Sequence, residues 1–125
     1  MSDYETGMNT RRDVLGDEHV DRAAAAAGTF GEPFQELITR YAWGAVWSRP
    51  GLDRRMRSAI TLAALVSLRA ENELGMHVRA ALRNGLTAEE IREVLLHTAV
   101  YAGVPAANAA FAQARGVLRE EGVIA

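Results

Sequence analysis

The chain has 125 residues, and it contains no cysteine and no lysine. The absence of cysteine excludes disulfide bonds, thiol nucleophiles, thiolate metal ligands and Cys-x-x-Cys redox chemistry. All 14 basic residues are arginines, whose planar guanidinium groups suit bidentate binding of carboxylates. The formal net charge of −2 gives no reason to expect a nucleic-acid partner.

Long hydrophobic runs are also absent. The longest uncharged apolar stretch, SAITLAALVSL between Arg57 and Arg69, is shorter than the roughly 20 residues that span a membrane. The first residues, MSDYETGMNTRRDV, are acidic and polar, unlike a signal peptide. We therefore expect a soluble cytoplasmic protein with no membrane partner.

No segment alternates polar and apolar residues for long enough to predict a β-strand. With 49% hydrophobic and 24% charged residues, the composition is that of a globular domain, and residues 1–125 are predicted to form a single one. The expected fold is all-α, a bundle of about six helices.

Glycine and proline divide the first half of the chain. The alanine run of residues 22–28, RAAAAAG, predicts a helix that stops at its glycine. Residues 32–47 repeat apolar side chains at helical spacing, and the Pro-Gly pair at 50–51 predicts the break that follows. Asp53 is in position to cap the next helix, which is predicted to run to about Leu68. The apolar positions of the helix over 32–47 are Phe34, Leu37, Ile38, Tyr41 and Ala42.

The clearest helix boundaries lie in the second half. The Asn-Gly pair at 84–85 predicts the end of one helix. Thr87 and Glu90 fit a capping box at the start of the next helix, and Leu86 is placed to pack on Ile91 as a hydrophobic staple.

The predicted helix before Leu68 is apolar nearly all round in its second half. Such a helix must be covered on every side, and a chain this short has limited capacity to cover it alone. We therefore expect a homo-oligomer. The apolar positions are Ile60, Leu62, Ala63, Ala64, Leu65 and Val66.

Glu73 precedes His77 by four positions in ELGMHVRAALRNG. On a helix this spacing puts both side chains on one face, with Cβ atoms roughly 5–6 Å apart. The carboxylate would orient the imidazole and favour its protonated form, whereas burial would disfavour that form. The pair is a candidate general acid or base, and the alternative is that His77 is a hydrogen-bonded core residue.

A metal site is not predicted, because one Glu-x-x-x-His pair offers two ligands and no second set completes it. The other two histidines are interpreted as structural. His19 fits a cap or an inter-helix contact, and His97, one turn before Tyr101, fits a partly exposed packing residue.

Residues 41–58, YAWGAVWSRPGLDRRMRS, combine indoles with guanidinium groups. Trp43 and Trp47 are four apart and can cover one face of a helix end. One interpretation is a pocket wall for an anionic ligand. The other, which the residues alone favour, is a pair of core or interface aromatics beside a solvated charge run. The arginines of this segment are Arg49, Arg54, Arg55 and Arg57.

Four segments together, RRDVLGDEHVDRA, PFQELITRYAWGAVWSRPGLDRRMRS, ELGMHVRAALRNG and EEIREVLLHTAVYAGVPAANAAF, resemble the gamma-carboxymuconolactone decarboxylase family. The resemblance extends from about Gly7 to Leu118. Its patterns Trp-Gly-x-x-Trp-x-Arg-Pro-Gly and Tyr-x-Gly-Val-Pro-Ala-Ala-Asn are more specific than any short catalytic motif.

The resemblance implies the alkylhydroperoxidase D-like fold, which is small, all-α and oligomeric, here as a trimer or hexamer. The disulfide reductases of that superfamily carry Cys-x-x-Cys-x-x-x-His on one helix and a glutamate on the helix before it. Aligned with this chain, the cysteines fall on Ala70 and Glu73, the histidine on His77 and the glutamate on Ser58. The thiol activity therefore does not carry over.

The implied activity is decarboxylation of 4-carboxymuconolactone to 3-oxoadipate enol-lactone, a lyase step in the protocatechuate branch of the beta-ketoadipate pathway. The carboxylate leaves a ring carbon that is conjugated to the lactone carbonyl. Because the substrate supplies its own electron sink, no metal, thiamine or pyridoxal cofactor is expected.

With that substrate, His77 is the expected proton donor, and Glu73 is expected to orient the imidazole of His77 and to reprotonate it. Arg54 and Arg55 remain further candidates for contact with the dianionic lactone. The alternative is a non-catalytic small-acid-binding or assembly protein on the same scaffold. The expected substrate-binding residues are Arg49 and Arg57 for the carboxylates, Ser58 as a hydrogen-bond donor, and Trp47, which would exclude water.

Overall fold

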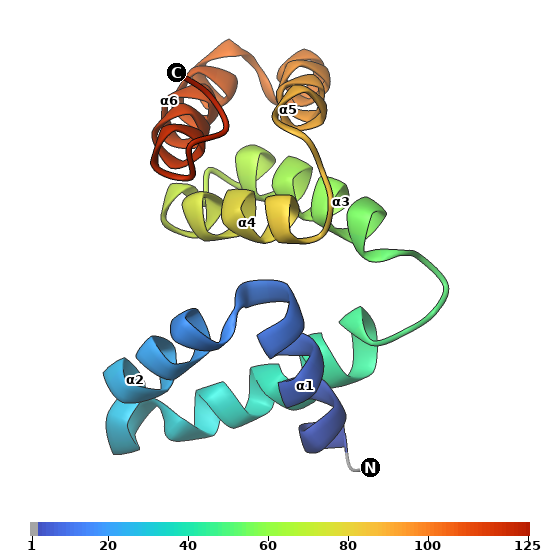
Figure 1. The fold of residues 1–125 in the computed structure, drawn as a ribbon, viewed down its shortest axis with the longest axis vertical. Helices are drawn as coiled ribbons and strands as arrows, with labels where there is room; N and C mark the ends of the chain where they lie inside the picture. Colours follow the sequence, from blue (N-terminus) through green and yellow to red (C-terminus); the bar gives the residue numbers. More distant parts are fainter. Residues whose placement is uncertain (1–2) are drawn as a thin grey trace. The chain divides into compact units, whose positions relative to one another are not determined.

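A computed structural model describes residues 3–125, which form six α-helices, one π-helix and no strand (Figure 1). The all-α prediction is therefore confirmed. The chain divides into two compact units, one ending at Asp53 and one starting at Arg54, and each is described by itself. That residues 1–125 act as one domain stays a prediction. No helix within residues 3–125 is long and apolar enough to cross a membrane.

The N-terminal unit consists of α1 (Asp3–Leu15), α2 (Asp17–Ile38) and the π-helix η1 (Thr39–Trp47). Gly28 interrupts α2 with φ 56° and ψ −158°, so the alanine run ends at the predicted glycine. The helix predicted over 32–47 is continuous, but its last nine residues adopt the wider π turn.

Helix α1 packs on η1 through two glycines. A Cβ atom on Gly7 would lie 2.0 Å from the carbonyl oxygen of Thr39, and one on Gly44 would lie 2.5 Å from that of Asp3. Any side chain at either position would collide with the opposing backbone. Glycine is therefore required where these two helices meet.

The face of η1 that packs inward is not the stripe formed by the apolar positions noted in residues 32–47. Thr39 and Trp43 are buried, whereas most of the stripe faces outward. The reason is that the close approach at Gly7 and Gly44 turns the threonine–tryptophan face toward α1. The large apolar side chains left exposed on α2 and η1 are Phe30, Phe34, Leu37, Tyr41 and Val46, at 99%, 60%, 58%, 67% and 41%.

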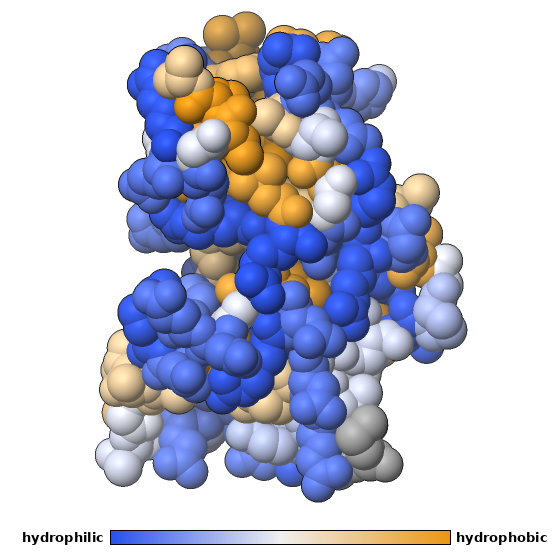
Figure 2. All heavy atoms as spheres, viewed as in Figure 1, coloured by the Kyte–Doolittle hydropathy of each residue, from blue (hydrophilic) through white to orange (hydrophobic). Residues whose placement is uncertain are grey.

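The C-terminal unit consists of α3 (Arg54–Ser67), α4 (Glu71–Arg83), α5 (Ala88–Ala102) and α6 (Val104–Glu120). One hydrophobic core joins all four helices, and burial of each large side chain there contributes about 1.5–3 kcal/mol. Between α5 and α6 a groove of about 200 Å³ remains, and Figure 2 shows apolar surface in this part of the unit with hydrophilic borders. The largest fully buried core side chains are Leu62, Leu74, Ile91 and Leu95.

Helix α3 is only partly covered by its own unit. Leu62 and Val66 are buried, whereas Ile60 and Leu68 remain 53% and 76% exposed. The expectation that every side of this helix is covered is therefore not met by the single chain. The homo-oligomer inferred from it stays a prediction.

The predicted boundary after α4 is confirmed in atomic detail. Gly85 has φ 98°, its N–H donates to the Leu82 carbonyl (3.1 Å), and the Leu86 N–H donates to the Ala81 carbonyl (3.0 Å). This pair of bonds is a Schellman motif, which satisfies carbonyls at a helix end.

The capping box before α5 is also present. The Glu90 N–H donates to Thr87 Oγ1 (3.1 Å), and the Thr87 N–H donates to Glu90 Oε1 (2.9 Å). Leu86 and Ile91 are both buried in the same core, as the predicted staple requires. The ends of α4 and α5 are thus fixed by local bonds as well as by packing.

Candidate functional site

Helices α3 and α4 of the C-terminal unit carry four of the six predicted site residues. His77 lies on α4 and is half-buried, with its Nδ1 atom buried, and Glu73 lies one turn earlier and is exposed. The adjoining side of α4 packs into the core through Leu74 and Val78. The core therefore fixes which side of α4 presents His77, and the orientation of His77 by Glu73 stays a prediction.

Ser58, on α3, is 1% exposed, and its Oγ accepts a hydrogen bond from Asn84 Nδ2 at 2.8 Å. This bond ties α3 to the C-terminal end of α4 and leaves the hydroxyl proton of Ser58 for donation. Next to it, Arg57 is half-buried and its Nε atom is buried. The structure thus places Arg57 and Ser58 together on the helix that packs against α4.

Arg55, one of the further candidates for substrate contact, has a structural role. Its guanidinium donates to the Gly85 carbonyl and to the Glu90 carboxylate. This ion pair, followed by the bond from the Thr87 N–H, lowers the pKa of Glu90 below its ordinary value. Arg55 therefore joins the start of α3 to the turn between α4 and α5.

The other two predicted residues, Trp47 and Arg49, belong to the N-terminal unit. The Trp43 and Trp47 rings face each other with centroids 5.0 Å apart and planes tilted by 30°, so the predicted shared face is confirmed. Ser48 Oγ donates to the Trp43 carbonyl at 2.6 Å at the end of η1. Arg49 follows this end and is exposed.

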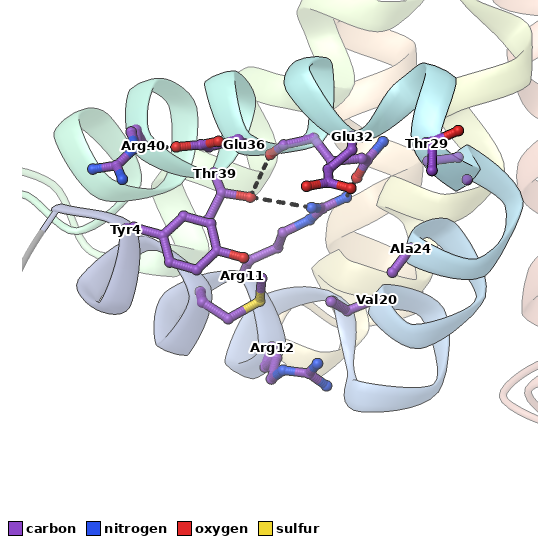
Figure 3. Close-up of a pocket in the computed structure, with 14 residues that line it drawn as sticks. Tyr4, Arg11, Arg12, Val20, Ala24, Thr29, Glu32, Glu36, Thr39 and Arg40 are labelled. Atoms are coloured by element: carbon purple, nitrogen blue, oxygen red, sulfur yellow. Dashed lines mark hydrogen bonds and ion pairs between the residues drawn. The ribbon is translucent and has the colours of Figure 1, made fainter.

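A cavity of about 600 Å³ lies within the N-terminal unit and was not expected from the sequence (Figure 3). Arg11 lines it and is only 5% exposed. A signal for this residue does exist in the chain. Arg11 follows Gly7 by four positions and precedes Val14 by three, and both of those are buried, so helical spacing puts Arg11 on the inner face of α1.

The histidines outside α4 fit their structural interpretation. The exposed His97 ring lies 5.4 Å from that of Tyr101, and His19 is half-buried in the first turn of α2. Within residues 3–125, no group of three or more histidine, aspartate or glutamate side chains is arranged to hold a metal ion.

An all-α chain with a half-buried histidine on α4, and without the paired cysteines of the redox branch, has the features of a cysteine-free alkylhydroperoxidase D-like protein. Comparison with known proteins agrees. The carboxymuconolactone decarboxylase family matches residues 32–116, and the chain belongs to that family.

Three relatives are informative. The chain is 47% identical over 120 residues to 4-carboxymuconolactone decarboxylase of Acinetobacter baylyi, covering 96% of this chain and 90% of the relative. It is 52% identical over 102 residues to nitrosuccinic acid decarboxylase npaB of Metarhizium robertsii, covering 82% and 71%. A 41-residue match to 4-carboxymuconolactone decarboxylase of Pseudomonas putida is 54% identical and covers 33% of this chain and 85% of the relative.

Proposed function

We propose that the chain decarboxylates 4-carboxymuconolactone to 3-oxoadipate enol-lactone. The observation that carries this proposal is the 47% identity to a 4-carboxymuconolactone decarboxylase across nearly the full length of both chains. The half-buried His77 adds a group able to transfer a proton in a partly dry environment.

The reaction needs little beyond binding, charge stabilisation and one proton. As the bond to CO2 breaks, its electron pair flows through the ring alkene to the lactone carbonyl and gives a dienolate. A proton is then added to the ring carbon next to that carbonyl, and water later returns a proton to the donor. General-acid help of this kind contributes typically about 10²–10⁴-fold.

In this proposal His77 donates the proton, and Glu73 orients the imidazole of His77 and helps to reprotonate it. Arg57 and Arg49 bind the two carboxylates of the dianion, because guanidinium groups match carboxylate geometry. Two further roles complete the proposed site: Ser58 donates a hydrogen bond and Trp47 excludes water.

A second substrate is favoured by the 52% identity to a nitrosuccinic acid decarboxylase. The two acids share a chemical class, since both are dicarboxylates with an electron-accepting group near the carboxylate that leaves. In nitrosuccinate the electron pair would pass to the nitro group and form a nitronate. The same arginines and proton donor suit both reactions.

The test compares the two acids directly. Purified protein is mixed with freshly prepared 4-carboxymuconolactone or nitrosuccinate, each with a chelator present, and CO2 release is followed. We expect kcat/KM for 4-carboxymuconolactone to be at least about tenfold higher, a difference of about 1.4 kcal/mol in transition-state stabilisation. The reverse ratio would assign the chain to the nitro acid. No release above the spontaneous rate from either acid would reject both substrates.

We also propose that residues 1–125 act as one catalytic domain and that the protein is a homo-oligomer, a trimer or hexamer. The family match to residues 32–116 includes residues of both compact units, which supports the single domain. The apolar side chains exposed on α2 and η1 support self-association, because large exposed apolar surfaces mark interaction sites.

A further inference from the structure

The cavity of the N-terminal unit is formed where α1, both segments of α2 and the start of η1 meet (Figure 3). Its lining residues all fall between Tyr4 and Arg40. A volume of about 600 Å³ lies within the range of small-molecule sites. The cavity is therefore large enough for a small organic acid.

Arg11 places a buried cation at this cavity. Its Nη1 donates to Thr39 Oγ1 (3.3 Å) and its Nη2 to Gln35 Oε1 (2.9 Å), and its buried Nε has no hydrogen-bond partner. Both acceptors are neutral. Loss of hydration on burial lowers the pKa of Arg11. A buried guanidinium without an anion is costly, so the site favours a negatively charged group.

The other cations of the lining already have carboxylate partners. Arg12 pairs with Asp17 (3.2 Å) and Asp21 (2.9 Å), and Arg40 pairs with Glu36 (3.2 Å). Within residues 3–125, Arg11 is the lining cation without an ion pair.

We propose that this cavity binds a small organic carboxylate, with the Arg11 guanidinium as its receptor. Each terminal nitrogen of the guanidinium keeps a second N–H that its two hydrogen bonds do not use, and charge-assisted hydrogen bonds from a guanidinium to a carboxylate are stronger than bonds between neutral groups. Met8, Val20 and Ala24 give the same cavity apolar surface for the carbon skeleton of the acid. This proposal goes beyond the proposed decarboxylation, because no residue assigned to that reaction lines the cavity.

Succinate is a suitable probe, and the two tryptophans are a suitable reporter. Both indoles lie in η1, the helix whose Thr39 contacts Arg11, so their fluorescence responds to the N-terminal unit. We expect saturable succinate binding, a rise in Tm with succinate, and no effect of neutral succinamide. Failure of wild-type protein to distinguish succinate from succinamide would overturn the proposal.

Variants then locate the site. Arg11→Gln should weaken succinate binding at least about tenfold, whereas Arg11→Lys should retain part of it. The matched control is Arg22→Gln, which removes an exposed arginine paired with Glu18 and should bind like wild type. Unchanged binding in Arg11→Gln, with wild-type tryptophan fluorescence, would place succinate elsewhere and reject the proposal.

Glu32 allows a further test of the proposal, because its exposed carboxylate also lines the cavity. If an acid occupies the cavity, Glu32→Gln removes a repulsive charge and should strengthen succinate binding. Weaker binding in Glu32→Gln would contradict the proposal.

A carboxylate can also come from a second copy of the chain, and the native mass distinguishes this source. We expect Arg11→Gln to keep the wild-type mass. A smaller mass, together with no binding of succinate to wild-type protein, would assign the anion to the neighbouring copy and overturn the small-acid proposal. CO2 release is a separate measurement, so this proposal and the proposed function fail independently.

Discussion

At the scale of single residues, side chains meet either within one helix or across two packed helices. Helical spacing was enough to put Trp43 beside Trp47 and to identify the capping residues of α5. It could not show that Asn84 binds Ser58, because their contact joins two different helices and depends on how α3 and α4 pack. The buried position of Arg11 was missed for a related reason, since arginine is almost never fully buried without a partner.

Replacement of His77 tests the proton donor. We expect His77→Ala to lower kcat at least about tenfold while the far-UV circular dichroism stays that of wild type. The matched control is His97→Ala, because His97 is exposed and contacts only the Tyr101 ring among described aromatic pairs. Full activity in His77→Ala would remove this residue from the mechanism.

Glu90 should make the fold sensitive to acid. Its pKa is lowered in the folded state by Arg55 and then by the Thr87 N–H, so the ionised carboxylate stabilises the fold. This stabilisation is complete above the unfolded pKa of about 4.3, and it is lost as pH falls through the lower folded value.

The measurement is urea unfolding of wild type and Glu90→Gln from pH 6 to 2.5. We expect wild type to be more stable at pH 6 and the difference to disappear toward the acid end. Glu89→Gln removes an adjacent exposed carboxylate and should leave the wild-type profile nearly unchanged. A difference between wild type and Glu90→Gln that is constant with pH would contradict the assignment.

At the scale of helices, the boundaries of a helix were easier to predict than the side of it that packs inward. The Asn-Gly pair and the capping box determine their boundaries through local bonds that the sequence shows directly. The inward face of η1 depends instead on the close contact between Gly7 and the Thr39 carbonyl, which is tertiary. Periodicity therefore identified the apolar stripe of residues 32–47, whereas tertiary packing buries the face that carries Thr39 and Trp43.

Gly7→Ala tests that contact. Because the new Cβ would lie 2.0 Å from the Thr39 carbonyl oxygen, we expect a loss of at least about 1–3 kcal/mol in the free energy of unfolding. The matched control is Gly116 in α6, where an added Cβ would meet no described atom within 4 Å, so Gly116→Ala should be neutral or stabilising. Urea unfolding followed by circular dichroism measures both, and equal stability of the two variants would refute the packing argument.

At the scale of the whole molecule, the family resemblance predicted more than residue patterns did. All-α structure follows from both, whereas the chemistry of a substrate with its own electron sink came only from the resemblance. The resemblance also implies a trimer or hexamer, whereas residue patterns do not give a subunit number, because that number depends on how exposed surfaces of separate copies match. The side chains exposed on α2 and η1 are where such matching can be tested.

The native mass provides that test. We expect wild type to elute as a multiple of its 13.6 kDa chain, and Phe34→Asp to shift toward the monomer because a charge on the exposed stripe opposes burial. Ala25→Asp adds a charge at an exposed site earlier on α2 and should keep the wild-type mass. Light scattering coupled to gel filtration decides between these outcomes, and a monomeric wild type would exclude self-association.

The bonds at the end of α4 also bear on how the protein ages. Asn-Gly pairs deamidate when the glycine nitrogen attacks the asparagine side chain to form a succinimide. Here the Gly85 N–H is engaged by the Leu82 carbonyl, and the Asn84 amide is held by Ser58. The native structure thus slows deamidation of Asn84, which would proceed readily in the unfolded chain. The extent of deamidation at Asn84 therefore measures how long this end of α4 has been open.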